Sequence, residues 1–103
     1  MKVSDKFYRM LGLAVKAGGA VFGEGAVKDS IRSHSARLVL VAEDASENTK
    51  KRFSDNCAFY DVPYFECGDR YLLGSFTGRS FAVVIAVTND GIAKNLIGTL
   101  SGQ

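Results

Sequence analysis

The segment from Gly23 to Lys28 combines residue types that could hold a phosphate group. Its sequence is Gly-Glu-Gly-Ala-Val-Lys, and Arg32 follows one helical turn after Lys28. Glycines let a backbone approach a ligand closely, and the free N–H groups at a helix start attract anions. The segment lacks the third glycine of a dinucleotide fingerprint and the Gly-Lys-Ser/Thr ending of a P-loop. We interpret it as a phosphate-facing turn, with a purely structural strand-to-helix turn as the alternative.

A second group of residues could hold a magnesium ion. Glu43 and Asp44 follow one predicted strand, and Thr88 and Asp90 follow another. Carboxylates at strand ends bind Mg²⁺ in phosphoryl-accepting domains. The lysine expected to complete such a site is missing, because Lys94 lies on a helix. We expect instead that Asp44 caps the turn into the next helix.

Other catalytic or metal-binding groups are not indicated. His34 is the single histidine, and Cys57 and Cys67 lie ten positions apart without a companion ligand. Two buried, reduced thiols are expected, with a redox pair as the minority interpretation. No catalytic triad, paired catalytic carboxylates or metal cluster is predicted. We therefore expect no enzyme activity, no cofactor and no metal.

The composition predicts one domain over residues 1–103, with 47% hydrophobic and 23% charged residues. The net charge of +2 is unevenly distributed. Residues 1–37 hold seven Lys/Arg against three acids, whereas residues 38–103 hold six against eight. Such asymmetry can mark a face that binds phosphates, although a solvated helix surface gives similar counts.

No membrane helix or secretory signal is predicted. The longest apolar run, Phe81–Val87, has seven residues, against the roughly 20 needed to cross a bilayer. Lys2, Asp5 and Lys6 interrupt any apolar region near the N-terminus. We expect a cytoplasmic protein.

The periodicity predicts nine elements that alternate between helix and strand. We expect Ser4 and Ser46 to cap helices, Asp90-Gly91 to cap the last helix, and Phe81–Val87 to be a central strand. The expected order is a helix from Ser4 to Gly18-Gly19, a strand at 20–22, a helix after Gly25, a strand at 38–42, a helix from Ser46, a strand at 62–65, a short helix from Gly68-Asp69 to about Gly78, a strand at 81–87 and a helix from Asp90 to Leu100. This order predicts a three-layer α/β/α sandwich with a four-stranded mixed sheet, helices on both faces and mostly parallel neighbours.

The loop Thr77-Gly78-Arg79-Ser80 precedes the predicted central strand, at the opposite end from Thr88. In this topology the loop could lie beside the Gly23 turn, so that Arg79 joins Lys28 and Arg32 in one basic surface. The run at 50–52 (Lys-Lys-Arg) is interpreted as a solvated helix face.

A set of short segments extends over nearly the whole chain in a distinctive order. The segments are 11–14 (LGLA), Gly23, 36–46 (ARLVLVAEDAS), 62–64 (VPY), Leu73-Gly74 with Gly78, and 82–88 (AVVIAVT). In this order and spacing they resemble the ribosomal L-seven-Ae and L-thirty-e superfamily, and most closely its bacterial ylxQ-type members.

The resemblance implies an α/β/α fold that binds structured RNA, typically the kink-turn, a sharply bent internal loop beside sheared G·A pairs. It places the RNA contact at the turn into the second helix, written Gly-x-Asn-Glu-x-x-Lys in archaeal members, and at the loop before the last strand. Counting back from Asp44 without gaps, Gly23 keeps the motif, whereas Gly25, Ala26 and Asp29 replace its Asn, Glu and Lys. These replacements remove groups able to read guanine edges, and Asp29 would repel phosphates.

We therefore expect a non-catalytic ribosomal-type protein that recognises structured, kink-turn-like RNA in translation or ribosome assembly. The expected partners are structured RNA, including ribosomal RNA, and ribosomal or other translation proteins, with no membrane and no DNA. The alternative is a protein-interaction module of the translation machinery that does not touch RNA. The expected RNA-binding residues are Gly23, Glu24, Gly25, Ala26, Lys28, Asp29, Arg32, Arg70, Arg79 and Ser80.

Overall fold

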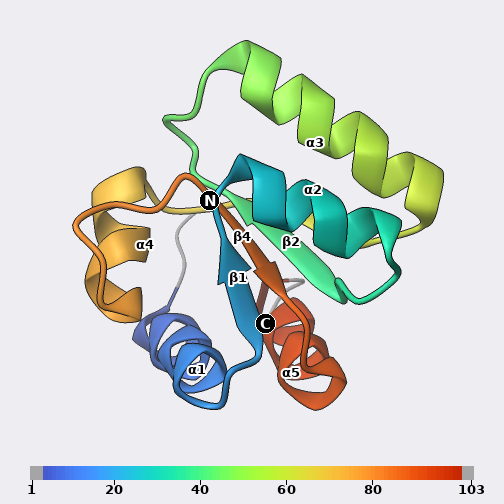
Figure 1. Cartoon of the computed structure of the whole chain (residues 1–103). Coiled ribbons are helices and arrows are strands. Elements are labelled where there is room, and N and C mark those ends of the chain that lie inside the picture. The colour runs from blue at the N-terminus through green and yellow to red at the C-terminus, as the bar shows by residue number, and fades with distance from the viewer. Residues whose placement is uncertain (1–3, 101–103) are drawn as a thin grey trace.

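The computed structural model describes residues 4–100, which form five helices around a four-stranded sheet (Figure 1). The helices are α1 (Asp5–Lys16), α2 (Glu24–Arg32), α3 (Glu47–Tyr60), α4 (Arg70–Thr77) and α5 (Asp90–Leu100). The strands are β1 (Ala20–Phe22), β2 (Leu38–Val41), β3 (Tyr64–Glu66) and β4 (Val84–Val87). The predicted alternation of helix and strand is confirmed. Every helix within residues 4–100 is too short or too polar to span a bilayer.

The strand order is β1-β4-β2-β3, so β4 is central, as predicted. It pairs antiparallel with both β1 and β2, and the parallel pair is β2 with β3. The mixed sheet is confirmed, whereas the expectation of mostly parallel neighbours is wrong. The reason is that α4 stays at the carboxyl end of β2, where Arg70 N–H donates to the Asp44 carboxylate at 3.1 Å. The chain therefore enters β4 from this end and runs against β2.

Side chains alternate across the sheet and build two hydrophobic cores, which confirms the three-layer sandwich. Leu38 and Leu40 point toward the layer of α1, α4 and α5, whereas Val39 and Val41 point toward α2 and α3. All four residues of β2 are buried, because both faces of a central strand are covered.

The predicted strand over Phe81–Val87 is too long at its start. The strand begins at Val84, and Phe81 is 57% exposed. The segment before β4 follows α4 instead, because Ala82 N–H donates to the Arg70 carbonyl at 2.8 Å. This approach requires a glycine at position 74, since a Cβ there would lie 2.6 Å from Phe81 Cα.

Two of the predicted helix caps are confirmed and one is wrong. The Ser4 and Ser46 hydroxyls accept N–H groups of Phe7 and Thr49 at 3.3 and 3.1 Å. The last helix is capped by Asn89, whose Oδ1 accepts the Ile92 N–H at 2.9 Å. Asp90 is already the first helical residue and pairs with Lys94 at 3.3 Å.

Candidate nucleic-acid interface

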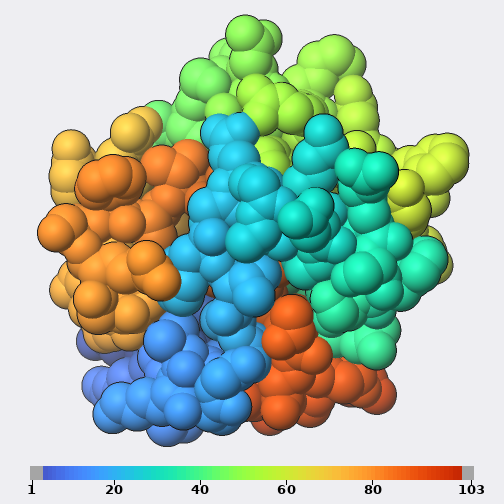
Figure 2. Space-filling model, in the orientation of Figure 1, coloured from blue at the N-terminus to red at the C-terminus, as the bar shows by residue number. Residues whose placement is uncertain are grey.

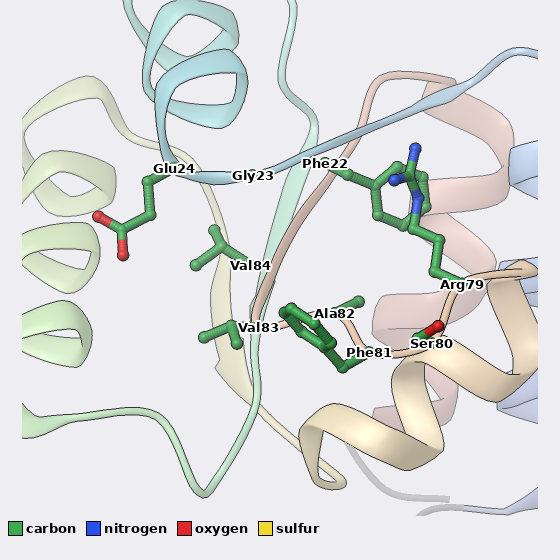
Figure 3. A pocket seen from close by; sticks show the side chains of 9 residues that line it. All are labelled: Phe22, Gly23, Glu24, Arg79, Ser80, Phe81, Ala82, Val83 and Val84. Atoms are coloured by element: carbon green, nitrogen blue, oxygen red, sulfur yellow. The ribbon is translucent and has the colours of Figure 1, made fainter.

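A cleft of about 510 Å³ opens where β1 turns into α2 and faces the loop before β4 (Figure 3). One wall is the turn Phe22–Glu24, and the other is the loop from Arg79 to Val83. The antiparallel pairing of β1 with β4 brings these two segments together, because Phe22 lies opposite Ile85. The predicted approach of the loop to the Gly23 turn is therefore confirmed.

The turn into α2 leaves the start of the helix uncovered. Gly23 has a φ of +90°, a conformation that favours glycine, and its N–H donates to the Val84 carbonyl at 3.2 Å. As the N-cap it offers no side-chain oxygen to the first N–H groups of the helix. A Cβ at Gly25 would also meet open space. The amides at the start of α2 are thus accessible to an anion.

Arg79 lies across the cleft with its guanidinium over the Phe22 ring, at 3.9 Å from the ring centroid (Figure 3). The left-handed C-cap Gly78 ends α4 and starts the loop that carries this arginine. Between residues 4 and 100, no carboxylate lies within ion-pair distance of Arg79. Its charge is therefore held in place without being neutralised. Ser80 beside it is exposed.

Glu24 lines the cleft, but its carboxylate is turned toward α3 and away from Arg79 (Figure 3). It forms an ion pair with Arg52, and Oε2 accepts the Thr49 hydroxyl at 3.4 Å. This network neutralises the acid nearest to the exposed amides of α2. A phosphate at the helix start would meet less repulsion from Glu24 as a result.

The basic run at 50–52 is only in part the solvated face that we expected. Lys51 is 78% exposed and pairs with Asp55 at 3.3 Å. Lys50 is 18% exposed and lies between Glu47 and Glu66, at 3.6 and 3.7 Å. Together with the pair formed by Arg52, these ion pairs neutralise the positive charges of α3 within the protein.

The remaining candidate residues of α2 extend away from the cleft along the exposed side of the helix. Ala26, Lys28, Asp29 and Arg32 are all exposed. Lys28 and Arg32 are four residues apart and share one side of the helix, with no ion pair to another residue of the described chain. Asp29 lies next to them, so this surface is less positive than two cations alone would make it.

Arg70 does not line the cleft with Gly23 and Arg79. Its Nε donates to the Asp44 carboxylate at 3.2 Å, and its Nη2 donates to the Asp44 carbonyl at 2.9 Å. Asp44 consequently anchors α4, and the expectation that it caps the turn into α3 is wrong, because Ser46 caps α3.

The possible magnesium site does not assemble. The register of the antiparallel pair places Leu38 opposite Val87 and Val41 opposite Val84. Thr88 therefore lies beside the start of β2, whereas Asp44 follows its end. In the described residues, no group of three or more His, Cys, Asp or Glu side chains could hold a metal ion.

The two cysteines are free and buried, as predicted. Cys57 belongs to the core on the α2 and α3 side of the sheet, and Cys67 belongs to the opposite core. The redox-pair interpretation is therefore wrong. Burial raises the pKa of the Cys57 thiol to about 11 and that of Cys67 to about 12, where nearby Glu43 adds to the effect. Both thiols stay protonated at neutral pH and are poor nucleophiles.

The candidate set derived from the sequence missed the apolar wall of the cleft. Phe22 supports Arg79, and Phe81 and Val83 line the opposite side. The uninterrupted apolar run that begins at Phe81 predicts a buried strand there, whereas Phe81 is exposed. The sequence signal for this exposure is the position of Phe81 directly after the polar loop Arg79-Ser80, before the start of β4 at Val84.

The molecule is a small three-layer α/β/α domain with a cleft between a strand-to-helix turn and the loop before the central strand. Residues 5–97 match the model of the ribosomal protein L7Ae/L30e/S12e/Gadd45 family, and the chain belongs to this family.

Two curated relatives are similar over most of their length. The chain is 44% identical to "RNA-binding protein YlxQ" of Bacillus subtilis (strain 168) over 95 residues, which cover 92% of this chain and 95% of that protein. It is 37% identical to "RNA-binding protein YlxQ" of Enterococcus faecium over 90 residues, which cover 87% and 86% of the two chains.

Two solved structures have the same fold. A protein of unknown function from Bacillus halodurans C superposes with a TM-score of 0.94 at 31% identity, covering 96% of this chain and 100% of the other. The Giardia lamblia 15.5kD RNA binding protein superposes with a TM-score of 0.80 at 16% identity, covering 97% and 92% of the two chains.

Proposed function

We propose that the protein binds structured RNA through the cleft between Gly23 and Arg79 and performs no catalysis. The observation that carries the proposal is the pairing of an uncapped helix start with an arginine whose charge is not neutralised, on facing walls of one cleft. The names of the two curated relatives support RNA as the ligand. Ribosomal RNA and proteins of translation or ribosome assembly are the proposed partners, which implies action in the cytoplasm.

The cleft offers two kinds of contact to RNA. The first amides of α2 can donate to a phosphate, and the N–H groups of Arg79 can donate to a second phosphate or to a base edge. Phe81 is an exposed aromatic wall against which an unstacked base can pack, which is how proteins commonly recognise irregular RNA. A bent RNA element presents both features at once, since its phosphates lie close together and its bases are displaced from the stack.

The proposed recognition depends on shape and phosphates more than on base edges. Gly25 and Ala26 carry no polar side-chain group, and Glu24 is held by Arg52. The backbone amides at these positions are accessible in their place. We propose a kink-turn-like element as the ligand, with a weaker dependence on its particular bases than the family's archaeal motif implies.

A titration against a kink-turn RNA and a scrambled stem of equal length, at about 150 mM salt, tests the proposal. We expect tighter binding to the kink-turn. Equal affinity for the two RNAs would contradict recognition of a bent element, and no binding to either would favour the interaction-module alternative. Both RNAs carry the same number of phosphates, so general electrostatic attraction alone cannot produce the preference.

A further inference from the structure

A second concave surface, a groove of about 630 Å³, lies between α1 and α4. Its α1 side carries Arg9, Leu13 and Lys16, and its α4 side carries Phe76 and Gly78. Leu13 is 55% exposed, and Arg9 and Lys16 are also exposed. Arg9 and Lys16 are seven residues apart, or about 10 Å along the helix axis.

The positive charges along this groove differ from those on α3, α4 and α5. Within residues 4–100, Arg9 and Lys16 form no ion pair, and neither does Arg79. Each cation of α3, α4 and α5 is paired with a carboxylate; these are Lys50, Lys51, Arg52, Arg70 and Lys94. The groove therefore keeps its positive charge available for an anionic ligand.

The groove also contains an aromatic surface. Phe76 stacks on Tyr8 with ring centroids 4.9 Å apart and an interplanar angle of 19°. Tyr8 is almost fully buried and fixes one side of the stack, whereas Phe76 is only half-buried and lines the groove. A rigid ring and two cations that line one groove are the combination that holds single-stranded nucleic acid, with the backbone on the charges and a base against the ring.

The groove adjoins the cleft of the proposed RNA site. Gly78 lines the groove, and the next residue, Arg79, lines the cleft, so one short turn forms a wall of both. Figure 2 shows this face of the molecule, with α1 below, the loop before β4 at the left and the start of α2 above. This shared turn would lead a strand that leaves the cleft past Arg79 into the groove.

We propose that an unpaired RNA strand, continuing from the element bound in the cleft, lies in the groove between α1 and α4. Arg9 and Lys16 bind its phosphates, and Phe76 packs against a base. This inference rests on the proposed function. An acidic peptide could also bind the cations of the groove. We favour RNA because the groove continues into the cleft proposed to bind RNA phosphates, and a peptide would not need that neighbouring site.

The test compares a blunt-ended kink-turn RNA with versions that carry an unpaired oligouridine tail at the 5′ or the 3′ end. For the unaltered protein, we expect one tail to raise the affinity and to steepen the salt dependence. The double substitution Arg9→Gln with Lys16→Gln should abolish this gain and lower the slope of log K against log salt by roughly 1.4 for the tailed RNA. Binding of the blunt RNA should not change.

The matched control is Lys51→Gln with Lys94→Gln, which removes the same charge from exposed positions on α3 and α5. This control should retain the full effect of the tail. If the protein binds the blunt RNA and neither tail raises the affinity, the groove proposal is overturned and the proposed function stands. An equal loss for blunt and tailed RNA in the Arg9 and Lys16 variant would also overturn it.

Oligouridine alone separates the two proposals further. If oligouridine binds in a way that depends on Arg9 and Lys16, the groove proposal is supported. If the protein at the same time shows no preference for the kink-turn over the scrambled stem, the proposed function is contradicted. A gain of equal size from a double-stranded extension would overturn the single-strand assignment, because a base-paired strand presents no free base to Phe76.

Discussion

The two helices that flank the sheet on the same side, α2 and α3, use their charged residues differently. On α3, Lys50, Lys51 and Arg52 are each paired with a carboxylate. On α2, Lys28 and Arg32 form no such pair within the described chain. Both helices bury an apolar side against the same core, so the fold does not require the difference.

The cations of α3 are engaged in ion pairs within the protein, whereas those of α2 remain available to a ligand. The same division applies to Arg70, which is fixed to Asp44, and Arg79, which is free of carboxylates in the described chain. Net charge alone does not reveal this, since both arginines contribute equally to the total of +2. We expect paired cations to affect stability and free cations to affect RNA binding.

The largest expected effect concerns the packing that positions Arg79. A Cβ at position 74 would lie 2.6 Å from Phe81 Cα and 2.8 Å from the Arg79 carbonyl oxygen. Because both contacts are with backbone, Gly74→Ala should push the loop away from α4 and lower the free energy of unfolding by about 1–3 kcal/mol. Chemical denaturation measures this loss, and RNA affinity should fall with it.

The control for this substitution is Gly98→Ala on α5, where a Cβ would meet open space. Replacing glycine inside a helix should here raise the unfolding free energy by about 0.5–1 kcal/mol. If Gly74→Ala behaved like Gly98→Ala, the close approach of the loop to α4 would be contradicted.

The next effect is on binding without a comparable effect on stability. Arg79→Gln should weaken binding of the structured RNA by about ten- to hundredfold, since a charge-assisted hydrogen bond contributes about 1.5–3 kcal/mol. Losing the contact with Phe22 should lower stability by no more than about 1 kcal/mol. A gel-shift titration and a denaturation curve on the same sample measure the two quantities.

Lys94→Gln is the matched control for Arg79→Gln. It removes one positive charge from α5, where Lys94 pairs with Asp90 at 3.3 Å. Its RNA affinity should stay close to that of the unaltered protein. Equal losses for the two variants would show that only the total charge matters and would remove Arg79 from the site.

Much of this architecture follows from local sequence patterns. The apolar periodicities predict all nine elements, and the serines at positions 4 and 46 predict two helix starts. Gly23 marks the turn that forms one wall of the cleft, and Gly78 marks the start of the loop that forms the other. These predictions succeed because each depends on residues that are close together in the chain.

The failures concern contacts between residues that are distant in the chain. The bond between Asp44 and Arg70 spans 26 positions, and it holds the start of α4 at the end of β2 from which the chain enters β4. The pair of Glu24 with Arg52 spans 28 positions. No periodicity encodes such partners, so the sequence alone could not distinguish the paired cations from the available ones. For the same reason it could not predict that Phe81 is exposed.

The smallest expected effect tests whether a paired cation can influence binding indirectly. Arg52 neutralises Glu24, which directly follows Gly23, the N-cap of α2. Arg52→Gln should cost about 0.2–1 kcal/mol of stability, as is usual for exposed ion pairs. It should also weaken RNA binding about two- to fivefold, because the released carboxylate would repel a phosphate at the start of α2.

The double variant Glu24→Gln with Arg52→Gln distinguishes repulsion from simple loss of positive charge. If Glu24 repels the phosphate, removing it should restore the affinity that Arg52→Gln loses. If Arg52 itself contacts RNA, affinity should stay low in the double variant. Lys51→Gln, on the same helix with its own partner Asp55, should leave affinity unchanged in either case. Restoration in the double variant would mean that the bond between α2 and α3 preserves the anion site, although neither of its charges touches the RNA.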